Sequence, residues 1–195
     1  MNLTKIVEAV TQELRRPDLT VAATRAVRTV IAQVHSAAHF RRDLVEDVID
    51  LGAPVNLVKF PLPPRFKDYH YLRPITPTGH PIALPGTRGT YTPVAPNDVM
   101  TPGGANRTNC YYVAGAATVL SSAVAVQHLA VAYWQLPDIR NPLLESWAMA
   151  IDAELFILGA VAMLYASPLR QDQVAIATQR QYQEALQAFI LMYGV

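Results

Sequence analysis

Residues 108–137 read TNCYYVAGAATVLSSAVAVQHLAVAYWQLP and contain no Asp, Glu, Lys or Arg. An uncharged stretch of this length is long enough for a transmembrane helix. However, Gln127 and His128 interrupt it, and its second half is rich in β-forming residues. These features favour buried strands over a membrane span. The best strands are predicted at 110–113 and 129–136, with a further segment at 117–121.

Proline and glycine divide the chain around this stretch. Twelve of the fifteen prolines and seven of the nine glycines lie between residues 51 and 141, so the flanks are free to be helical and the centre is not. We predict an α+β fold: a helical bundle of two N-terminal and two C-terminal helices, with a large Pro-rich insertion of strands and loops. The predicted boundaries are 1–50 and 142–195 for the bundle and 51–141 for the insertion. Residues 75–108 lack apolar periodicity and are predicted to form an extended arm.

Both flanks carry apolar residues at helical spacing. Two proline signals, Asn141-Pro142 and Ser167-Pro168, predict where the C-terminal helices begin. Asp152 and Glu154 interrupt an otherwise apolar helix and are expected to be partly buried, paired with an arginine. The predicted bundle core consists of Val27, Val30, Val34, Trp147, Ile151, Leu155, Leu158, Leu186, Phe189 and Ile190.

Composition excludes several classes of protein. Of the 195 residues, 51% are hydrophobic and 16% are charged, which excludes a disordered chain. The net charge of +1 argues against a strongly basic nucleic-acid binder. A single cysteine, Cys110, excludes an internal disulfide framework and a multi-cysteine zinc site, and is expected to be a buried thiol.

The enzyme motifs in this sequence are incomplete. His35 and His39 have the spacing of zinc ligands, but Ser36 stands where a zinc protease requires glutamate. Asp43, Glu46, Asp47 and Asp50 could form an acid–base cluster, although charged runs are usually solvated, and no Gly-x-Ser-x-Gly elbow is present. We therefore predict no catalytic residues, no metal and no cofactor. A hydrolase using His35/His39 or the Asp/Glu cluster remains the alternative function.

Two sets of residues are predicted to contact other subunits. Basic and aromatic residues alternate in the insertion, a pattern that also occurs in single-strand nucleic-acid binders, but a subunit contact is favoured. The chain has no charged residue after Glu184, so its apolar end is expected to bury against a partner. The predicted inter-subunit residues of the arm are Arg65, Tyr69, Tyr71, Arg88, Tyr91 and Arg107, and the predicted partner-contact residues are Leu191, Met192, Tyr193, Gly194 and Val195.

Four stretches carry a resemblance to a known family. They are WAMAIDAELFILGAVAMLYA at 147–166, QRQYQEALQAF at 179–189, YYVAG at 111–115 and AYWQLP at 132–137. Their order, with two helices before them, resembles the head-to-tail adaptor (connector) proteins of tailed bacteriophages.

This resemblance implies a structural protein and not an enzyme. Such adaptors form a homo-oligomeric ring, usually of twelve copies, that attaches beneath the portal protein, extends the DNA channel and docks the tail. The implied partners are the portal and a tail tube or nozzle protein, with DNA passing without sequence-specific binding and no membrane contact. The implied location is the virion neck, and the host cytoplasm during assembly.

Overall fold

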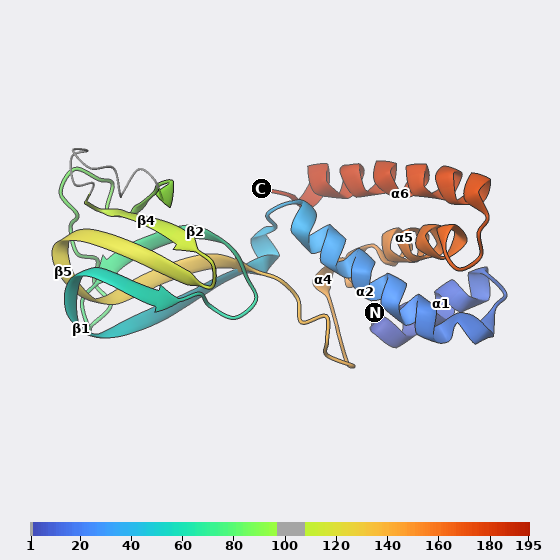
Figure 1. The fold of residues 1–195 in the computed structure, drawn as a ribbon, viewed down its shortest axis with the longest axis horizontal. Helices are drawn as coiled ribbons and strands as arrows, with labels where there is room; N and C mark the ends of the chain where they lie inside the picture. The colour runs from blue at the N-terminus through green and yellow to red at the C-terminus, as the bar shows by residue number, and fades with distance from the viewer. Residues whose placement is uncertain (1, 97–107) are drawn as a thin grey trace. The chain divides into compact units, whose positions relative to one another are not determined.

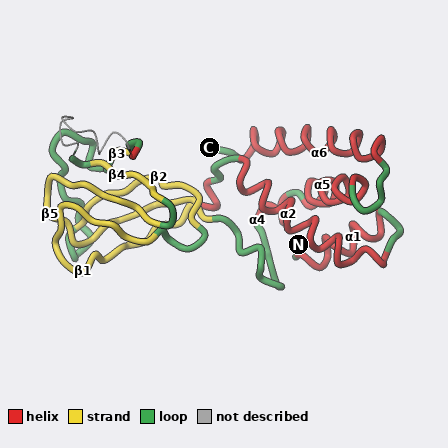
Figure 2. The backbone as a smooth tube through the Cα atoms, in the orientation of Figure 1, coloured by secondary structure: helices red, strands yellow, loops and turns green. Residues whose placement is uncertain are grey.

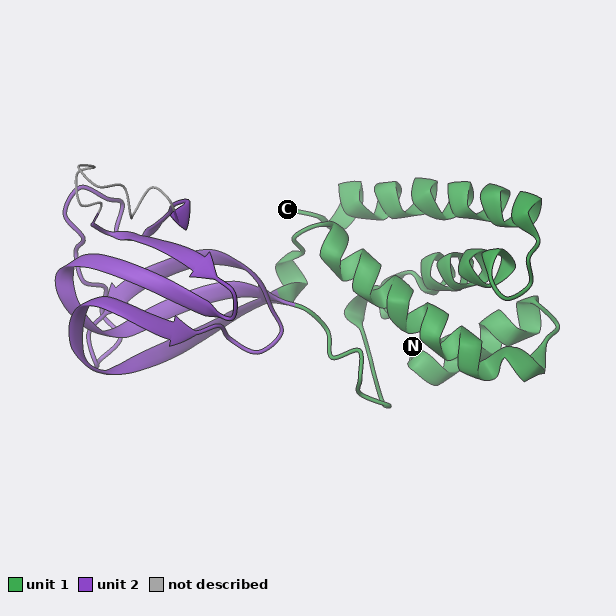
Figure 3. Cartoon of the chain, in the orientation of Figure 1, with its two compact units in different colours: residues 1–43, 136–195 green, residues 44–135 purple. Residues whose placement is uncertain are grey.

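The computed structural model describes residues 2–96 and 108–195 and divides the chain into two compact units (Figure 3). Residues 1–43 and 136–195 form the helical unit, and residues 44–135 form the sheet unit. Helices and strands are almost completely segregated between them (Figure 2). Each unit has its own hydrophobic core and is described by itself.

The predicted architecture, a helical bundle with a large Pro-rich insertion, is wrong. The structure is α+β with a five-stranded mixed sheet, and its strand content is too large for an insertion into a bundle. The strands are β1 (Leu44–Pro61), β2 (Phe66–Ile75), β3 (Thr92–Pro93), β4 (Cys110–Ala114) and β5 (Ala117–Gln135).

Strand β5 organises the sheet (Figure 1). It pairs with β1 along most of its length, with β4 over residues 117–121 and with β2 over residues 128–135. All these pairings are antiparallel, and only the short β3 runs parallel to its neighbour β4. The uncharged stretch at 108–137 therefore supplies a hairpin, with Gly115 at a positive φ of 60° in its turn.

The prolines and charges of the sheet unit explain the error. Pro54 lies where the register between β1 and β5 shifts, and Pro61 ends β1. Prolines are tolerated at such irregular positions and strand ends. Glu46 and Asp47 are exposed on β1, so they hide the strand's apolar alternation. The prolines of this unit thus mark strand ends and irregular positions, so their number does not indicate how much of the chain is strand.

The described part of the predicted arm, residues 75–96 and 108, belongs to the sheet unit. Leu84 and Tyr91 are buried in the core of that unit, and the Tyr91 N–H donates to the Leu72 carbonyl at 2.8 Å. Residues 97–107 lie outside the described part of the chain. The remaining core residues are Phe60, Tyr69, Leu72, Tyr111, Leu120, Val126, Leu129, Val131 and Tyr133, and burial raises the pKa of Tyr111 to about 12.

The helical unit combines both ends of the chain. Its helices are α1 (Leu3–Glu13), α2 (Thr20–Ala37), α4 (Trp147–Ile151), α5 (Ala153–Ala166) and α6 (Asp172–Tyr193). Helix α5 contacts α1, α2 and α6, and α5 and α6 run side by side (Figure 1). None of the described helices is both long and apolar enough to span a membrane.

The C-terminal helices begin later than the proline signals predict. Ser146 caps α4 by accepting the Ala148 N–H at 3.2 Å, and α6 begins at Asp172. Asp152 caps α5 by accepting the Leu155 N–H at 3.0 Å. The carboxylate of Asp152 therefore satisfies a helix end, a role different from the arginine pairing that the sequence predicts.

The predicted core is partly right. Val27, Val30, Val34 and Leu155 are buried, as are Leu186 and Phe189. Trp147, Leu158 and Ile190 are only partly buried, and Ile151 is 37% exposed because α4 ends there and Asp152 starts a new helix. Phe156, which is not part of the predicted core, is fully buried. Helix α5 is covered on several sides, so its buried residues do not follow one stripe.

Gly159 tests how tightly this core is packed. A Cβ at Gly159 would lie 2.8 Å from Cε2 of buried Tyr182 and 3.0 Å from Cγ1 of Val30. Helix propensity favours Ala by about 1 kcal/mol, but overpacking costs about 1–3 kcal/mol. We expect Gly159→Ala to lower the free energy of unfolding, measured by urea denaturation followed by circular dichroism. A gain in stability would contradict the close packing.

Candidate functional site

Four polar side chains are hydrogen-bonded to one another in the helical unit. His35 is 1% exposed, with Nδ1 2.7 Å from Oδ2 of Asp43 and Nε2 2.8 Å from Oγ of Ser146. The indole N–H of Trp147 donates to Oδ1 of Asp43 at 2.6 Å. We call these four residues the Asp43 network. It joins the segment around residues 35–43 to residues more than one hundred positions later in the chain.

Local structure positions each member of the network. His35 lies in the last turn of α2. Asp43 ends the 3₁₀ turn Arg41–Asp43, and its N–H donates to the Phe40 carbonyl at 2.9 Å. Ser146 is the N-cap of α4, and Trp147 is the first residue of that helix. Helix ends and a tight turn therefore present all four groups.

One tautomer satisfies the hydrogen bonds of the network. With the hydrogen on Nδ1, His35 donates to Asp43 and accepts the hydroxyl of Ser146 at Nε2. Ser146 in turn accepts the Ala148 N–H. The rings of Phe40 and Trp147 flank the imidazole edgewise, at centroid distances of 6.2 and 5.7 Å. Apolar rings around a polar chain make each hydrogen bond costly to lose.

The order carboxylate, imidazole, hydroxyl is also the order of a nucleophilic triad. A nucleophile must reach a substrate carbonyl, yet Ser146 is only 6% exposed and its oxygen already accepts a backbone N–H. The neighbouring pocket is lined by Phe40 and Trp147, and neither His35 nor Ser146 contributes to its lining. The geometry is best explained as a structural cluster that holds α2 against α4.

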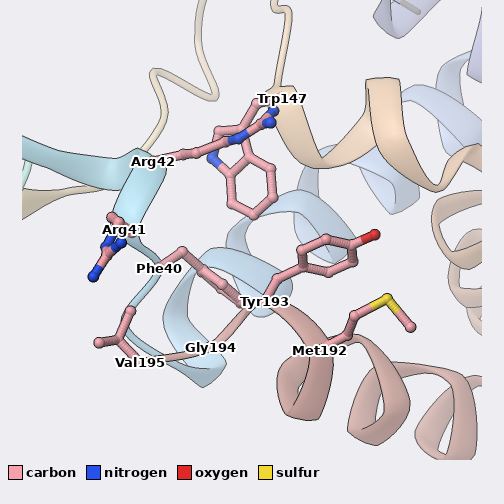
Figure 4. Close-up of a pocket in the computed structure, with 8 residues that line it drawn as sticks. All are labelled: Phe40, Arg41, Arg42, Trp147, Met192, Tyr193, Gly194 and Val195. Carbon is pink, nitrogen blue, oxygen red and sulfur yellow. The ribbon is translucent and has the colours of Figure 1, made fainter.

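A pocket of about 370 Å³ lies beside this network (Figure 4). The guanidinium carbon of Arg42 lies 5.7 Å from the ring centre of Trp147, within the range of a cation–π contact. Trp147 therefore contacts Asp43 through its N–H and Arg42 through its ring. The pocket is lined by Phe40, Arg41, Arg42, Trp147, Met192, Tyr193, Gly194 and Val195.

Residues 193–195 are fixed to the segment that follows α2. Gly194 forms an antiparallel bridge with Phe40, and the Val195 N–H donates to the His39 carbonyl at 2.8 Å. The predicted partner-contact residues thus gather at the pocket: Met192, Tyr193, Gly194 and Val195 line it. Leu191, Met192 and Val195 are 85%, 71% and 75% exposed.

The predicted inter-subunit residues occupy different environments in the sheet unit. Tyr69 and Tyr91 are buried, where their hydroxyls bond Thr118 at 2.8 Å and Ser122 at 3.0 Å. Their side chains belong to the core, so we do not include them among the proposed contacts. Of the others, Arg65 is exposed and donates to Gln135 at 2.9 Å, Tyr71 donates to Glu46 at 3.1 Å, Arg88 is exposed, and Arg107 lies outside the described residues.

The structure divides the predicted acid–base residues between two environments. Asp43 joins the network with His35, whereas Glu46, Asp47 and Asp50 lie on β1. Asp50 is 3.7 Å from Nδ1 of His128. Among the described residues, no group of three His, Cys, Asp or Glu side chains is placed to hold a metal ion.

No family model matches this chain, and no curated protein is significantly similar to it in sequence. Functional inference therefore depends on the residues of this chain.

Ser146 and Trp147 are members of the network that the sequence did not connect with His35. A serine directly before a helix is a recognisable N-cap, so Ser146 could have been placed at a helix start. Its contact with His35 spans 111 residues and carries no periodic signal. The hydrogen bond between His35 and Asp43 could not be predicted from the sequence either, because it depends on the turn between them.

Removing the Asp43 carboxylate should show its structural role. Asp43→Ala leaves the His35 Nδ1 and the Trp147 N–H without their acceptor, and an unpaired buried group costs about 1–3 kcal/mol. We expect a loss of about 3 kcal/mol in the free energy of unfolding, measured in urea by circular dichroism. Glu8→Ala, at an exposed position of α1 in the same unit, is the control and should change stability by less than about 0.5 kcal/mol. Equal stability of the two variants would contradict the assignment.

Proposed function

We propose that this protein is a structural virion subunit, a head-to-tail adaptor. In this proposal, copies form a ring beneath the portal protein, the ring extends the DNA channel, and a tail tube or nozzle protein docks on it. The observation that carries the proposal is the exposed apolar end of α6. Residues 191–195, the five that are predicted to contact the portal, lie at this end of the helix.

Exposed apolar side chains occur elsewhere among the described residues, but three of them lie within five positions of the chain here. Leu191, Met192 and Val195 are each more than two-thirds exposed and lie close together in the chain. Burying such a side chain stabilises an interface by about 1.5–3 kcal/mol. Contiguous exposed apolar residues commonly mark protein contacts. A partner that covers the end of α6 would therefore gain several kcal/mol from these residues.

The stretches that resemble adaptor proteins lie on defined elements. Residues 147–166 form α4 and α5, and residues 179–189 lie within α6. Residues 111–114 lie on β4, and β5 ends at Gln135 within the last stretch. The resemblance thus involves the helices that build the core of the helical unit and the strands at the centre of the sheet.

The charge of the protein also supports this role. In a ring, each copy contacts the next through the same two faces. Apolar surface on those faces can hold the copies together. A net charge of +1 leaves little electrostatic attraction for DNA, so DNA could move through the channel without being held.

The mass of the protein, alone and mixed with purified portal rings, tests this proposal. We expect native mass spectrometry to show a complex in which several copies join one portal ring. In the double variant Leu191→Ser, Met192→Ser, we expect binding to the portal to weaken at least tenfold per residue, because each change removes apolar burial at the contact.

Val21→Ser is the matched control, because Val21 is 66% exposed on α2 of the same unit and lies far from residues 191–195 in sequence. It should bind the portal like the parent. A parent protein that stays monomeric and does not bind portal rings would refute the adaptor proposal.

A serine hydrolase is the second candidate, and one observation favours it. Asp43, His35 and Ser146 have the contacts of a catalytic triad, at 2.7 and 2.8 Å. The enclosure of Ser146 places this function second. The structure adds Ser146 to a candidate that the sequence based on His35 and the Asp/Glu cluster alone.

A fluorophosphonate probe separates the two candidates. This reagent labels serines that an adjacent base has activated. We expect no labelling of the parent protein, because the Ser146 oxygen is buried and already hydrogen-bonded. Labelling of the parent that disappears in Ser146→Ala, while labelling persists in Ser121→Ala, would place the hydrolase first.

A further inference from the structure

The segment between β5 and α4 projects from the helical unit as a loop (Figure 3). Asn141 holds its backbone, because its side-chain oxygen accepts the Leu143 N–H at 2.9 Å and its carbonyl accepts the Leu144 N–H at 3.2 Å. Leu144 is buried, and its carbonyl accepts the Leu3 N–H at 3.2 Å. Leu143, the next residue, is 80% exposed. The loop therefore presents a leucine to solvent from a backbone that is hydrogen-bonded in place.

Helices α5 and α6 form an apolar groove of about 570 Å³ near the connection between them. Among the residues that line it, Arg180 alone is charged, and its Nε lies 3.1 Å from Oε1 of Glu184. Ile176 is 71% exposed at the groove. The groove therefore suits an uncharged, apolar occupant. Its apolar lining consists of Ala162, Met163, Ala166, Ala175 and Ile176.

The tip of the loop has the chemistry that the groove requires. Residues 141–143 read Asn-Pro-Leu and carry no charge. Among the large apolar side chains of the described residues, Leu191 alone is more exposed than Leu143, and Leu191 belongs to the proposed portal contact. A projecting loop can also enter a groove between two helices without moving the element that carries it. A second copy of this chain therefore offers a matching occupant.

The loop and the groove lie at different places on the helical unit. The loop is anchored to the start of α1, whereas the groove lies near the point where α5 leads into α6. These two places are well separated in Figure 1. One copy can therefore offer its loop to one neighbour and its groove to another. Such a heterologous contact closes into a ring when the rotation between copies allows it.

We propose that the loop of one copy inserts Leu143 into the α5–α6 groove of the next copy in the ring. Leu143 packs on Ile176 and on the alanines of the groove. Arg140, which is exposed three positions before Leu143, pairs with Asp172, which is exposed one helical turn before Ile176. Neither of these two residues belongs to an ion pair found among the described residues. This inference rests on the proposed adaptor function and identifies the contact between its subunits.

Charges near this contact set its orientation, and apolar burial supplies its affinity. Both surfaces carry charges of both signs. Asp138 and Glu145 lie on either side of the loop tip, and Arg170 lies two residues before Asp172. The Asp138 carboxylate already accepts the Arg140 N–H at 3.1 Å. With mixed signs on each side, the pairing of Arg140 with Asp172 selects one alignment of the loop in the groove.

Two single variants and their mixture test the contact, with the purified chain as its own probe. Leu143→Glu and Ile176→Glu each place a charge on one side of it. We expect each variant to self-associate at least tenfold more weakly than the parent in sedimentation velocity. Their equimolar mixture should form a dimer and nothing larger, because one variant keeps an intact groove and the other an intact loop. Val21→Glu, exposed on α2 and outside both surfaces, is the matched control and should associate like the parent.

A charge swap tests the orientation. We expect Arg140→Glu to weaken self-association by about two- to fivefold, as for an exposed ion pair. The double variant Arg140→Glu, Asp172→Arg should restore it, because the opposite charges meet again. A double variant that associates no better than Arg140→Glu would overturn the proposed alignment.

The outcomes separate this inference from the adaptor function. The contact is overturned if the parent stays monomeric at every concentration, if Leu143→Glu associates like the parent, or if the mixture stays monomeric. Portal binding by the parent would keep the adaptor function in each of these cases. Self-association through this contact without portal binding would refute the adaptor function alone. Circular dichroism of each variant verifies that these exposed substitutions leave the fold intact.

Discussion

The carboxylate of Asp43 is the constraint on which the helical unit depends. A buried carboxylate must be hydrogen-bonded, or the unit would lose several kcal/mol. Its donors come from His35, eight residues earlier, and from Trp147, 104 residues later. The chain leaves the helical unit after residue 43 and returns at 136. The network therefore links the two chain segments that form the helical unit, residues 1–43 and 136–195.

Trp147 transmits this constraint to the surface. Its N–H is held by Asp43, its ring lies 5.9 Å from Phe189 in a stacked geometry, and Arg42 lies over the same ring. An exposed cation–π contact contributes only about 0.5–1 kcal/mol. The pocket must therefore be ordered mainly by the contacts of Trp147 with Asp43 and Phe189. A substitution in the network should disturb the pocket even when it leaves every lining residue unchanged.

The sequence predicted features that repeat locally and missed those that depend on distant contacts. The spacing of Leu3, Ile6, Val7 and Val10 predicts α1, and the uncharged stretch predicts strands where β4 and β5 lie. Strand β2 was missed because its alternating basic and aromatic residues were interpreted as a contact surface. The contact between His35 and Ser146 was missed because neither residue indicates the other. The partner-contact residues were predicted from composition, and their position at a pocket with two arginines required the structure.

The acidic residues of β1 have a physical role that does not need catalysis. Among the described residues, β1 pairs only with β5, so its other edge is unpaired, and Val48 and Leu57 are exposed on it. Such an edge invites pairing with another copy. If two β1 edges paired antiparallel about Val48, Glu46 of one copy would lie opposite Asp50 of the other, and like charges across strands are destabilising. These carboxylates therefore oppose a two-fold dimer through the sheet. Self-association that avoids this edge is compatible with the head-to-tail contacts that a ring requires.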